Sequence, residues 1–265
     1  MMLCIIAPAK RIKTDEVFML PRHQPFFLED SRKLLPTLKA LNQEQLRRLL
    51  KCSPQIAEEA RKQYQILDLN KEGTPALLSY DGIQYQTMAP HVFTDEQLDY
   101  VERHVQILSG FYGLLRPLDG IHPHRLEMDS PLKTPEFRSL YEFWGDRLYQ
   151  HLAQSDSVLI DLASAQHARS VSRYAASPVR YIKCWFYEKT GMGLREKGVY
   201  VKIARGEMIR YLAEIRAENP EQLKMFNRRG YCYQGRFSDD HNFVFTRDKG
   251  EIYETKNRNY RGGGR

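Results

Sequence analysis

The feature that most constrains the fold is an apolar run at the start of the chain. Residues 3–7 read Leu-Cys-Ile-Ile-Ala, and Pro8 and Lys10 follow at once. A strand with one wet face alternates apolar and polar residues, whereas an unbroken apolar run is typical of a strand covered on both faces. The run is too short to span a bilayer, which takes about 20 residues, and no basic segment precedes it as in a signal peptide. We therefore predict a buried strand here.

Strands and helices alternate along the rest of the chain. Asn42 with Gln45, and Ser53 with Pro54, have the spacing of helix starts. The apolar patterns predict helices at residues 27–41, 94–108, 139–152 and 206–217, and strands at 75–80, 157–163, 179–187, 199–204, 231–233 and 242–246. Such interspersion indicates an α/β (mixed α+β) fold, with a mixed sheet flanked by helices in one domain over residues 1–255. Residues 256–265 are expected to form a disordered basic tail.

Basic residues are concentrated in the C-terminal part of the chain. The formal net charge is +7, and residues 195–265 hold 16 Lys and Arg against 10 Asp and Glu. A basic surface attracts nucleic acid, although many soluble domains have basic faces without such a partner. Four scattered cysteines, Cys4, Cys52, Cys184 and Cys232, lack a C-x-x-C spacing. They indicate a reduced, cytoplasmic protein with buried free thiols.

The stretch at residues 107–119 reads Ile-Leu-Ser-Gly-Phe-Tyr-Gly-Leu-Leu-Arg-Pro-Leu-Asp. A helix, a turn with Gly110 and Gly113, and a second apolar run predict an αα-hairpin. Amide N–H groups of such a turn, from Ser109 onward, would face a phosphate, and Arg116 would add a charge. Helix-hairpin-helix modules hold DNA backbones in this way without reading sequence. The alternative is an ordinary tight turn in the core.

Basic side chains also follow the first strand. Lys10, Arg11 and Lys13 stand at its carboxyl end, the edge where open α/β sheets bind ligands. Asp161 and Ser164 end the strand at residues 157–163. An aspartate in an apolar run is costly to bury unpaired, so we expect a Lys10–Asp161 pair, unless Asp161 is an exposed strand-end or capping residue.

Two further arginines flank the predicted start of the helix at residues 206–217. Arg205 and Arg210 belong to the basic part of the chain, and Arg205 would reach an anion bound at the same sheet edge. Solvated arginines are the alternative.

Metal ligands are not indicated at recognisable spacing. The pair His122 and His124, with Glu127 nearby, suggests an iron site. The two histidines lack a third and a fourth ligand at a recognisable metal-binding spacing, however. No phosphate-binding or nucleophile motif occurs either. The sequence therefore predicts no metal site and no cofactor, with an iron site at these three residues as an alternative.

Taken together, the quoted residues resemble the bacterial YaaA family of peroxide-stress proteins. The resemblance rests on residues 108–119 and on shorter matches in family order over nearly the whole chain: Pro8-Ala-Lys10, His124-Arg-Leu-Glu-Met128, the segment at residues 141–145, Leu162-Ala-Ser164, Ala204-Arg-Gly206 with Met208, and Gly230-Tyr231. It implies a single domain of the YaaA fold with a positively charged cleft and a helix-hairpin-helix element. It also implies double-stranded DNA binding and a role in limiting damage from peroxide and unincorporated iron.

Carried over by position, Ser109, Gly110 and Gly113 match the glycine turn, and Lys10, Arg116, Arg125 and Arg205 match basic positions of the cleft. The chain departs from the family pattern at four places: Ala7 stands for the usual serine, His124 for a tyrosine, and Gln166 and His167 for an acidic residue and a tyrosine.

The first hypothesis is a monomeric, sequence-independent binder of double-stranded DNA that does not associate with membranes. Its contacts would come from Lys10, Arg11, Lys13, Ser109, Gly110, Gly113, Arg116, Arg125, Arg205 and Arg210. The alternative is an enzyme acting on a phosphorylated or nucleotide-like small molecule at the strand-end cleft. Lys10 and Arg205 would then hold the anion, and Asp161 and Ser164 would belong to the catalytic set.

Overall fold

The protein is built on a mostly parallel sheet flanked by helices, which confirms the predicted α/β class. The computed structural model describes residues 2–14, 17, 19–155 and 158–248. Within these residues the middle of the sheet consists of parallel strands in the order β12-β9-β8-β1-β5. Their bounds are β1 (Met2–Ile6), β5 (Val105–Ser109), β8 (Val158–Leu162), β9 (Arg180–Thr190) and β12 (Asn242–Asp248). The expected tail at residues 256–265 lies outside the described residues.

Shorter strands complete the sheet and make two small ribbons. Antiparallel partners at the sheet are β6 (Gly113–Leu115) on β5, β10 (Gly193–Arg195) on β9, and β11 (Cys232–Tyr233) on β12. The ribbons pair β2 (Arg11–Ile12) with β4 (Tyr80–Asp81), and β3 (Thr74–Pro75) with β7 (Gly120–Ile121). The ribbon of β2 and β4 holds the segment directly after β1, which contains the basic residues Arg11 and Lys13.

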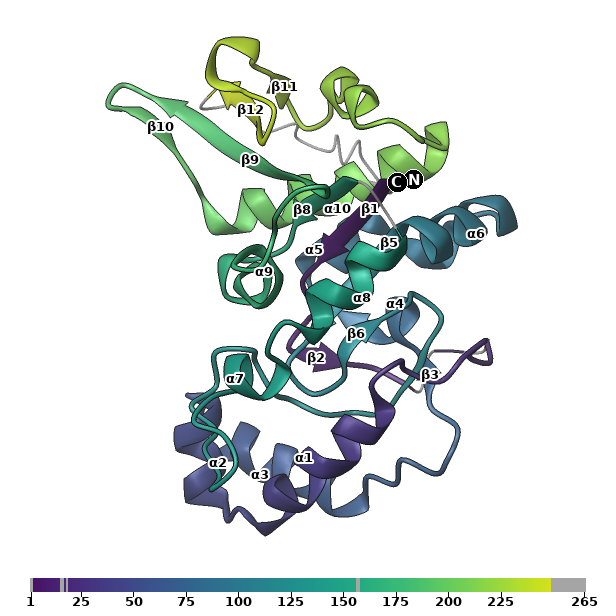
Figure 1. Cartoon of the computed structure of the whole chain (residues 1–265), viewed down its shortest axis with the longest axis vertical. Coiled ribbons are helices and arrows are strands. Elements are labelled where there is room, and N and C mark those ends of the chain that lie inside the picture. Colours follow the sequence, from purple (N-terminus) through teal and green to yellow (C-terminus); the bar gives the residue numbers. More distant parts are fainter. Residues whose placement is uncertain (1, 15–16, 18, 156–157, 249–265) are drawn as a thin grey trace, which may run out of the picture.

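The helices form two groups. Helices α1 (Leu28–Ala40), α2 (Gln43–Leu50) and α3 (Pro54–Ile66) gather at the end of the molecule away from the sheet (Figure 1). The others are α4 (Ala76–Ser79), α5 (Ile83–Met88), α6 (Asp95–His104), α7 (Leu140–Trp144), α8 (Arg147–Ser155), α9 (Ala165–Ser172) and α10 (Gly198–Ile215), with 3-10 turns η1 (Pro90–Val92), η2 (Pro220–Met225) and η3 (Gly235–Phe237). Helix α10 packs on α5 and α6, and α8 packs on α9. The predicted starts at Asn42 and Ser53 are confirmed, since both side chains cap the helices that follow.

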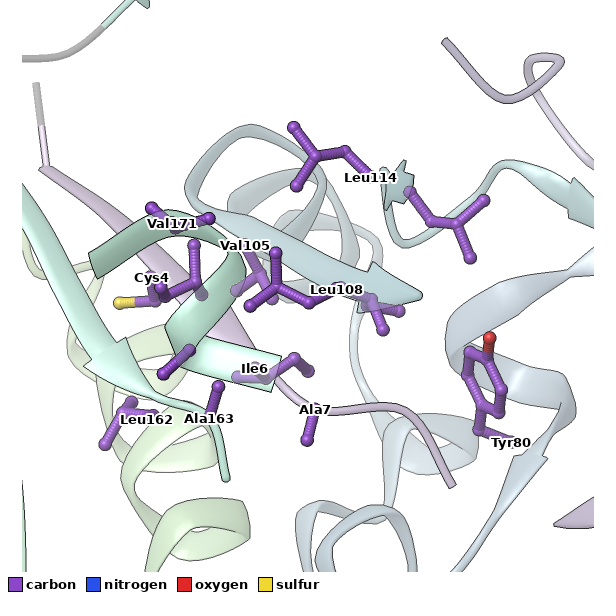
Figure 2. Packing of buried hydrophobic residues seen from close by; sticks show 14 of the residues in the cluster. Cys4, Ile6, Ala7, Tyr80, Val105, Leu108, Leu114, Leu162, Ala163 and Val171 are labelled. Atoms are coloured by element: carbon purple, nitrogen blue, oxygen red, sulfur yellow. The ribbon is translucent and has the colours of Figure 1, made fainter. Parts of the chain in front are cut away.

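Strand β1 is buried along its whole length, as the apolar run predicted. Figure 2 shows Cys4 and Ile6 of β1 in one apolar cluster with Val105 and Leu108 of β5. Burial raises the pKa of the Cys4 thiol to about 12, so the thiol stays protonated and inert. Cys184 is buried as well, whereas Cys52 is half-buried and Cys232 is exposed. The prediction of buried thiols is therefore confirmed for Cys4 and Cys184 only.

Four predicted elements differ from the structure. Residues 199–204 belong to helix α10 and are not a strand, because a short apolar run does not distinguish a buried strand from a buried helix. Residues 75–80 contain the single helical turn α4. The helix predicted at 139–152 is broken at Gly145, whose φ is +55°. The helix predicted at 94–108 ends at His104, and strand β5 begins at Val105.

Candidate functional site

The carboxyl ends of β1 and β8 lie side by side at the point where the chain connections diverge. These strands pair in parallel, with Ile5 opposite Asp161 and Ile6 opposite Leu162. The next parallel strand after β1 is β5, on the far side of β1, and the next after β8 is β9, on the far side of β8. Such a switch point leaves a crevice that binds ligands in open α/β sheets.

A cavity of about 470 Å³ occupies this crevice. Its lining comes from five segments: the loop after β1, the start of α5, the loop that contains Glu127, the start of α9 and one side of α10. The polar residues that concern us are Lys10, Gln84, Glu127, Ser164, His167 and Arg205. We call it the switch-point cavity. Three predicted site residues, Lys10, Ser164 and Arg205, are therefore brought together from positions far apart in the sequence.

Arg205 is a half-buried arginine without a protein acceptor. Among the described residues no hydrogen bond or salt bridge is formed by its guanidinium, and its Nε is buried without a partner. Burial lowers the pKa of Arg205, and the charge of nearby Asp161 works against that effect. A guanidinium carries five N–H donors that seek acceptors. Arg205 is therefore prepared to receive an anion in the cavity.

Gly206 explains how Arg205 is held there. A Cβ atom built at Gly206 would lie 2.2 Å from the carbonyl oxygen of Gln84. Only glycine allows the backbones of α10 and α5 to approach so closely. The close contact places the preceding residue, Arg205, and the α5 residue Gln84 on the same cavity.

Asp161 does not pair with Lys10, so the predicted ion pair is wrong. The Asp161 side chain is buried, and its Oδ1 accepts the N–H of Ala163 at 2.9 Å. Burial raises the pKa of the Asp161 carboxyl, while that hydrogen bond and the charges of Arg205 and Lys183 oppose the rise. The carboxylate is thus bonded to the backbone at the end of its own strand. Lys10 is exposed and does not pair with it.

Ser164 and His167 form a side-chain pair at the start of α9. Ser164 is the N-cap residue, yet its hydroxyl makes no capping bond and lies 2.9 Å from His167 Nδ1. His167 is 2% exposed, and burial lowers its pKa to about 4, so the imidazole is neutral at pH 7. In the sequence His167 stands out only as a departure from the YaaA pattern, because no neighbouring residue shows that it faces a cavity.

A second cavity, of about 360 Å³, lies beside α3 and shares Lys10 with the first. We call it the α3 cavity. Its basic lining residues are Lys10, Arg11, Lys13 and Arg125. Arg11 and Lys13 approach the Asp81 carboxylate at 3.4 and 3.7 Å. The side chain of Arg125 is half-buried and forms no hydrogen bond within the described part of the chain, with a buried, unpartnered Nε.

The glycine segment is not a helix-hairpin-helix. Residues Val105–Ser109 and Gly113–Leu115 are the antiparallel strands β5 and β6. Ser109 is buried, and its hydroxyl accepts the N–H groups of Phe111 and Tyr112 at 3.3 and 3.1 Å. The amides that were expected to hold a phosphate are thus used inside the turn. Pairing of Val105 with Cys4 in the sheet overrides the helical spacing that the local sequence suggests.

Gly110 and Gly113 serve packing. A Cβ atom at Gly110 would lie 2.4 Å from the carbonyl oxygen of Leu126. Gly113 has φ +74°, and a Cβ atom there would lie 2.8 Å from the Trp144 ring. The Trp144 indole N–H also donates to the Gly110 carbonyl at 3.1 Å. Both glycines are sealed in the interior, so the prediction that they touch DNA is wrong.

Arg116 and Arg210 are held by other partners. Arg116 Nε lies 2.8 Å from Asp119 Oδ1, in contact with a carboxylate that is fully buried. Arg210 forms an ion pair with Glu214 at 2.9 Å and donates to the Met88 carbonyl at 3.3 Å. Neither arginine lines the two cavities, so the structure does not gather them with Lys10, Arg125 and Arg205.

The three residues of the alternative iron site do not converge. His122 Nε2 is 3.1 Å from the Lys71 carbonyl, and His124 Nδ1 is 2.7 Å from the His122 carbonyl. Glu127 instead accepts from Gln166 Nε2 at 2.7 Å. No group of three or more His, Cys, Asp or Glu side chains suited to a metal ion occurs among the residues described.

His124 makes the stability depend on pH. Burial lowers its pKa to about 4, from 6.5 in the unfolded chain, so the unfolded state binds more protons between these values. We expect its contribution, up to roughly 3 kcal/mol of the free energy of unfolding, to be complete above pH 6.5 and lost as the pH falls toward 4. Urea denaturation of wild type and His124→Phe between pH 7 and 5 measures it. The variant should lose less stability than wild type, and the exposed-site control His91→Phe should follow wild type; equal losses in His124→Phe would contradict the assignment.

The sequence matches a known protein family over most of its length. The family model described as peroxide stress protein YaaA matches residues 2–236. The chain belongs to the YaaA family. A UPF0246 protein of Desulfitobacterium hafniense is 46% identical over 250 residues, which cover 94% of this chain and 100% of the relative. UPF0246 proteins of Agathobacter rectalis and Lachnoclostridium phytofermentans are each 38% identical, over 93% and 96% of this chain and 99% and 100% of theirs.

The residues expected from the sequence to depart from the YaaA pattern line the two cavities. Ala7, Gln166 and His167 line the switch-point cavity, and His124 lines the α3 cavity. The matching glycines, by contrast, lie at close backbone approaches in the interior. No helix in the described part of this family member is long and apolar enough to cross a membrane.

Proposed function

We propose that this YaaA-family protein binds double-stranded DNA without sequence preference and thereby limits iron-dependent damage during peroxide stress in the cytoplasm. The observation that supports the proposal is the series of cations around Lys10. Lys10 lines both cavities, Arg125 belongs to one and Arg205 to the other. In the described part of the chain the side chains of Arg125 and Arg205 have no acceptor of their own.

Phosphates of a DNA backbone supply the missing acceptors. Contacts to phosphate position a protein on a duplex and carry no sequence information directly. Binding releases the cations condensed on the DNA. Ferrous iron is such a cation, so a protein lying on the phosphates lowers the amount of iron that reacts with peroxide at the DNA surface.

The glycine turn has no part in this proposal, which distinguishes it from the prediction made from the sequence. The interface would consist of Lys10, Arg11, Lys13, Arg125 and Arg205, at the carboxyl edge of the sheet and along α3. Arg11 and Lys13 approach Asp81, so their contribution is smaller than that of the other three.

A salt titration tests the interface. We expect the logarithm of the affinity for a duplex to fall linearly with the logarithm of the salt concentration. The double variant Lys10→Gln, Arg125→Gln should lower the slope by about 2, since each lost phosphate contact contributes about 0.9. Fluorescence anisotropy with two unrelated duplexes measures slope and sequence dependence together.

A control variant and a clear counter-result accompany the titration. Arg195 is exposed on β10, which with the end of β9 projects beyond the other strands of the sheet (Figure 1), so Arg195→Gln should keep the wild-type slope. A slope that is the same in wild type and the double variant would show that DNA binds elsewhere. A strong preference for one duplex would contradict a backbone-only interface.

A further inference from the structure

The switch-point cavity contains more unpartnered polar side-chain atoms than a DNA contact requires. Gln84 is 6% exposed and His167 is 2% exposed, and each has a side-chain Nε2 without a partner. Buried polar groups are nearly always hydrogen-bonded, so two such groups in one cavity wall need an explanation. Arg205, also without an acceptor in the described residues, completes the group.

The start of α9 adds backbone donors to the same wall. The N–H groups of Ala165 and Gln166 have no acceptor within the described part of the chain. The hydroxyl of Ser164, which would normally cap such a helix, is bonded to His167 instead. An N-terminus with free N–H groups attracts an anion, and here it opens beside Lys10 and Arg205.

The charges of the lining indicate the valence of the ligand. Lys10, Lys202 and Arg205 are cationic, and Glu127 is the acidic residue among the residues that line the cavity. His167 is neutral at pH 7, because burial holds its pKa near 4. The lining therefore carries a formal charge of +2, which matches one phosphomonoester dianion.

The remaining polar groups fit hydroxyls. Glu127 accepts from Gln166 and has a carboxylate in the wall that can also accept from a ligand. The volume of about 470 Å³ is within the usual range for sites of small metabolites, and exceeds what a phosphate ion alone would fill.

We propose that the switch-point cavity is a binding site for a small hydroxylated phosphomonoester, such as a sugar phosphate or a nucleoside monophosphate. Arg205, Lys10 and the α9 N-terminus bind the phosphate, Ser164 donates its hydroxyl to it while accepting the Nδ1–H of His167, and Glu127 receives a hydroxyl of the ligand. The site shares Lys10 and Arg205 with the proposed DNA interface, but it also uses Ser164 and the α9 backbone, which that interface does not include.

Thermal unfolding and calorimetry of the full chain test the site with defined probes: inorganic phosphate, ribose 5-phosphate, glycerol 3-phosphate and adenosine monophosphate. At least one phosphomonoester should raise the midpoint of unfolding saturably and bind more tightly than inorganic phosphate. If all four probes leave the midpoint unchanged at millimolar concentration, the proposal is wrong. It is also wrong if the same chain responds to a 5′-phosphorylated duplex and to none of the small molecules.

Variants locate the binding and separate it from that of DNA. Ser164→Ala should weaken phosphomonoester binding about tenfold, as expected for one hydrogen bond to a charged group, and keep affinity for a duplex with 5′-hydroxyl ends. Ser172→Ala, at the exposed end of the same helix, is the matched control and should bind as wild type.

Arg205→Met should weaken phosphomonoester binding about a hundredfold, whereas Arg125→Met, in the α3 cavity, should leave it unchanged. The unfolding midpoint without ligand shows that each variant is folded. Unaltered phosphomonoester binding in both Ser164→Ala and Arg205→Met would overturn the assignment of the site. Absence of duplex binding by the wild-type chain in the salt titration, with phosphomonoester binding intact, would overturn the DNA proposal alone.

Discussion

Gly113→Val is expected to lower the free energy of unfolding by about 2–5 kcal/mol, the largest effect expected of any single substitution in this protein. A side chain in the left-handed region costs roughly 1–2 kcal/mol, and the φ of Gly113 is +74°. The new Cβ would lie 2.8 Å from the Trp144 ring, and such overpacking costs about 1–3 kcal/mol more. Urea denaturation followed by tryptophan fluorescence measures the loss.

A matched glycine substitution shows that the loss comes from this position. A Cβ atom at Gly191 has no heavy atom within 4 Å, so Gly191→Val should change the free energy of unfolding by less than about 0.5 kcal/mol. If Gly113→Val folds with wild-type stability but loses DNA binding, the glycine turn faces the DNA after all. The packing account given above would then fail.

Arg116→Met is expected to destabilise the protein by about 2–4 kcal/mol and to leave the salt dependence of DNA binding unchanged. Asp119 is fully buried, and its carboxylate accepts from the Arg116 backbone N–H at 2.9 Å and from Arg116 Nε at 2.8 Å. Burial raises the pKa of the Asp119 carboxyl to about 7, even though the charge of Arg116 lowers it. Removing one partner of a buried ion pair leaves an uncompensated charge, which costs more than a surface pair contributes.

The arginine also holds two other groups. Its guanidinium donates to the Gln24 carbonyl at 2.8 Å and lies 4.1 Å from the centre of the Phe26 ring. Arg22 provides the control, because its ion pair with Asp99 at 2.7 Å is exposed on both sides. Arg22→Met should cost less than about 1 kcal/mol. If folded Arg116→Met shows a smaller salt dependence of DNA binding than wild type, Arg116 contacts DNA and belongs to the interface.

Local sequence patterns determined the parts of this protein that depend on neighbouring residues. The apolar run at residues 3–7 predicted a buried strand, because continuous hydrophobicity requires cover on both faces. The caps at Asn42 and Ser53 predicted where α2 and α3 begin, because capping joins groups two or three residues apart. The position of Lys10 at the carboxyl edge of the sheet was predictable for the same reason, because Lys10 follows a strand in the chain itself.

Tertiary structure alone decided which residues meet and which are sealed. Gly110 lies against Leu126 and Trp144, and Gly206 against Gln84, contacts that span between 16 and 122 positions of sequence. Only these contacts show that one glycine segment is interior packing while another holds Arg205 on a cavity. The same holds for charge: Arg116 and Arg205 are both arginines in basic surroundings, but a buried carboxylate satisfies the first and no described protein group satisfies the second. Whether a donor is used is fixed by the acceptor it meets in space, and no local pattern of residues carries that information.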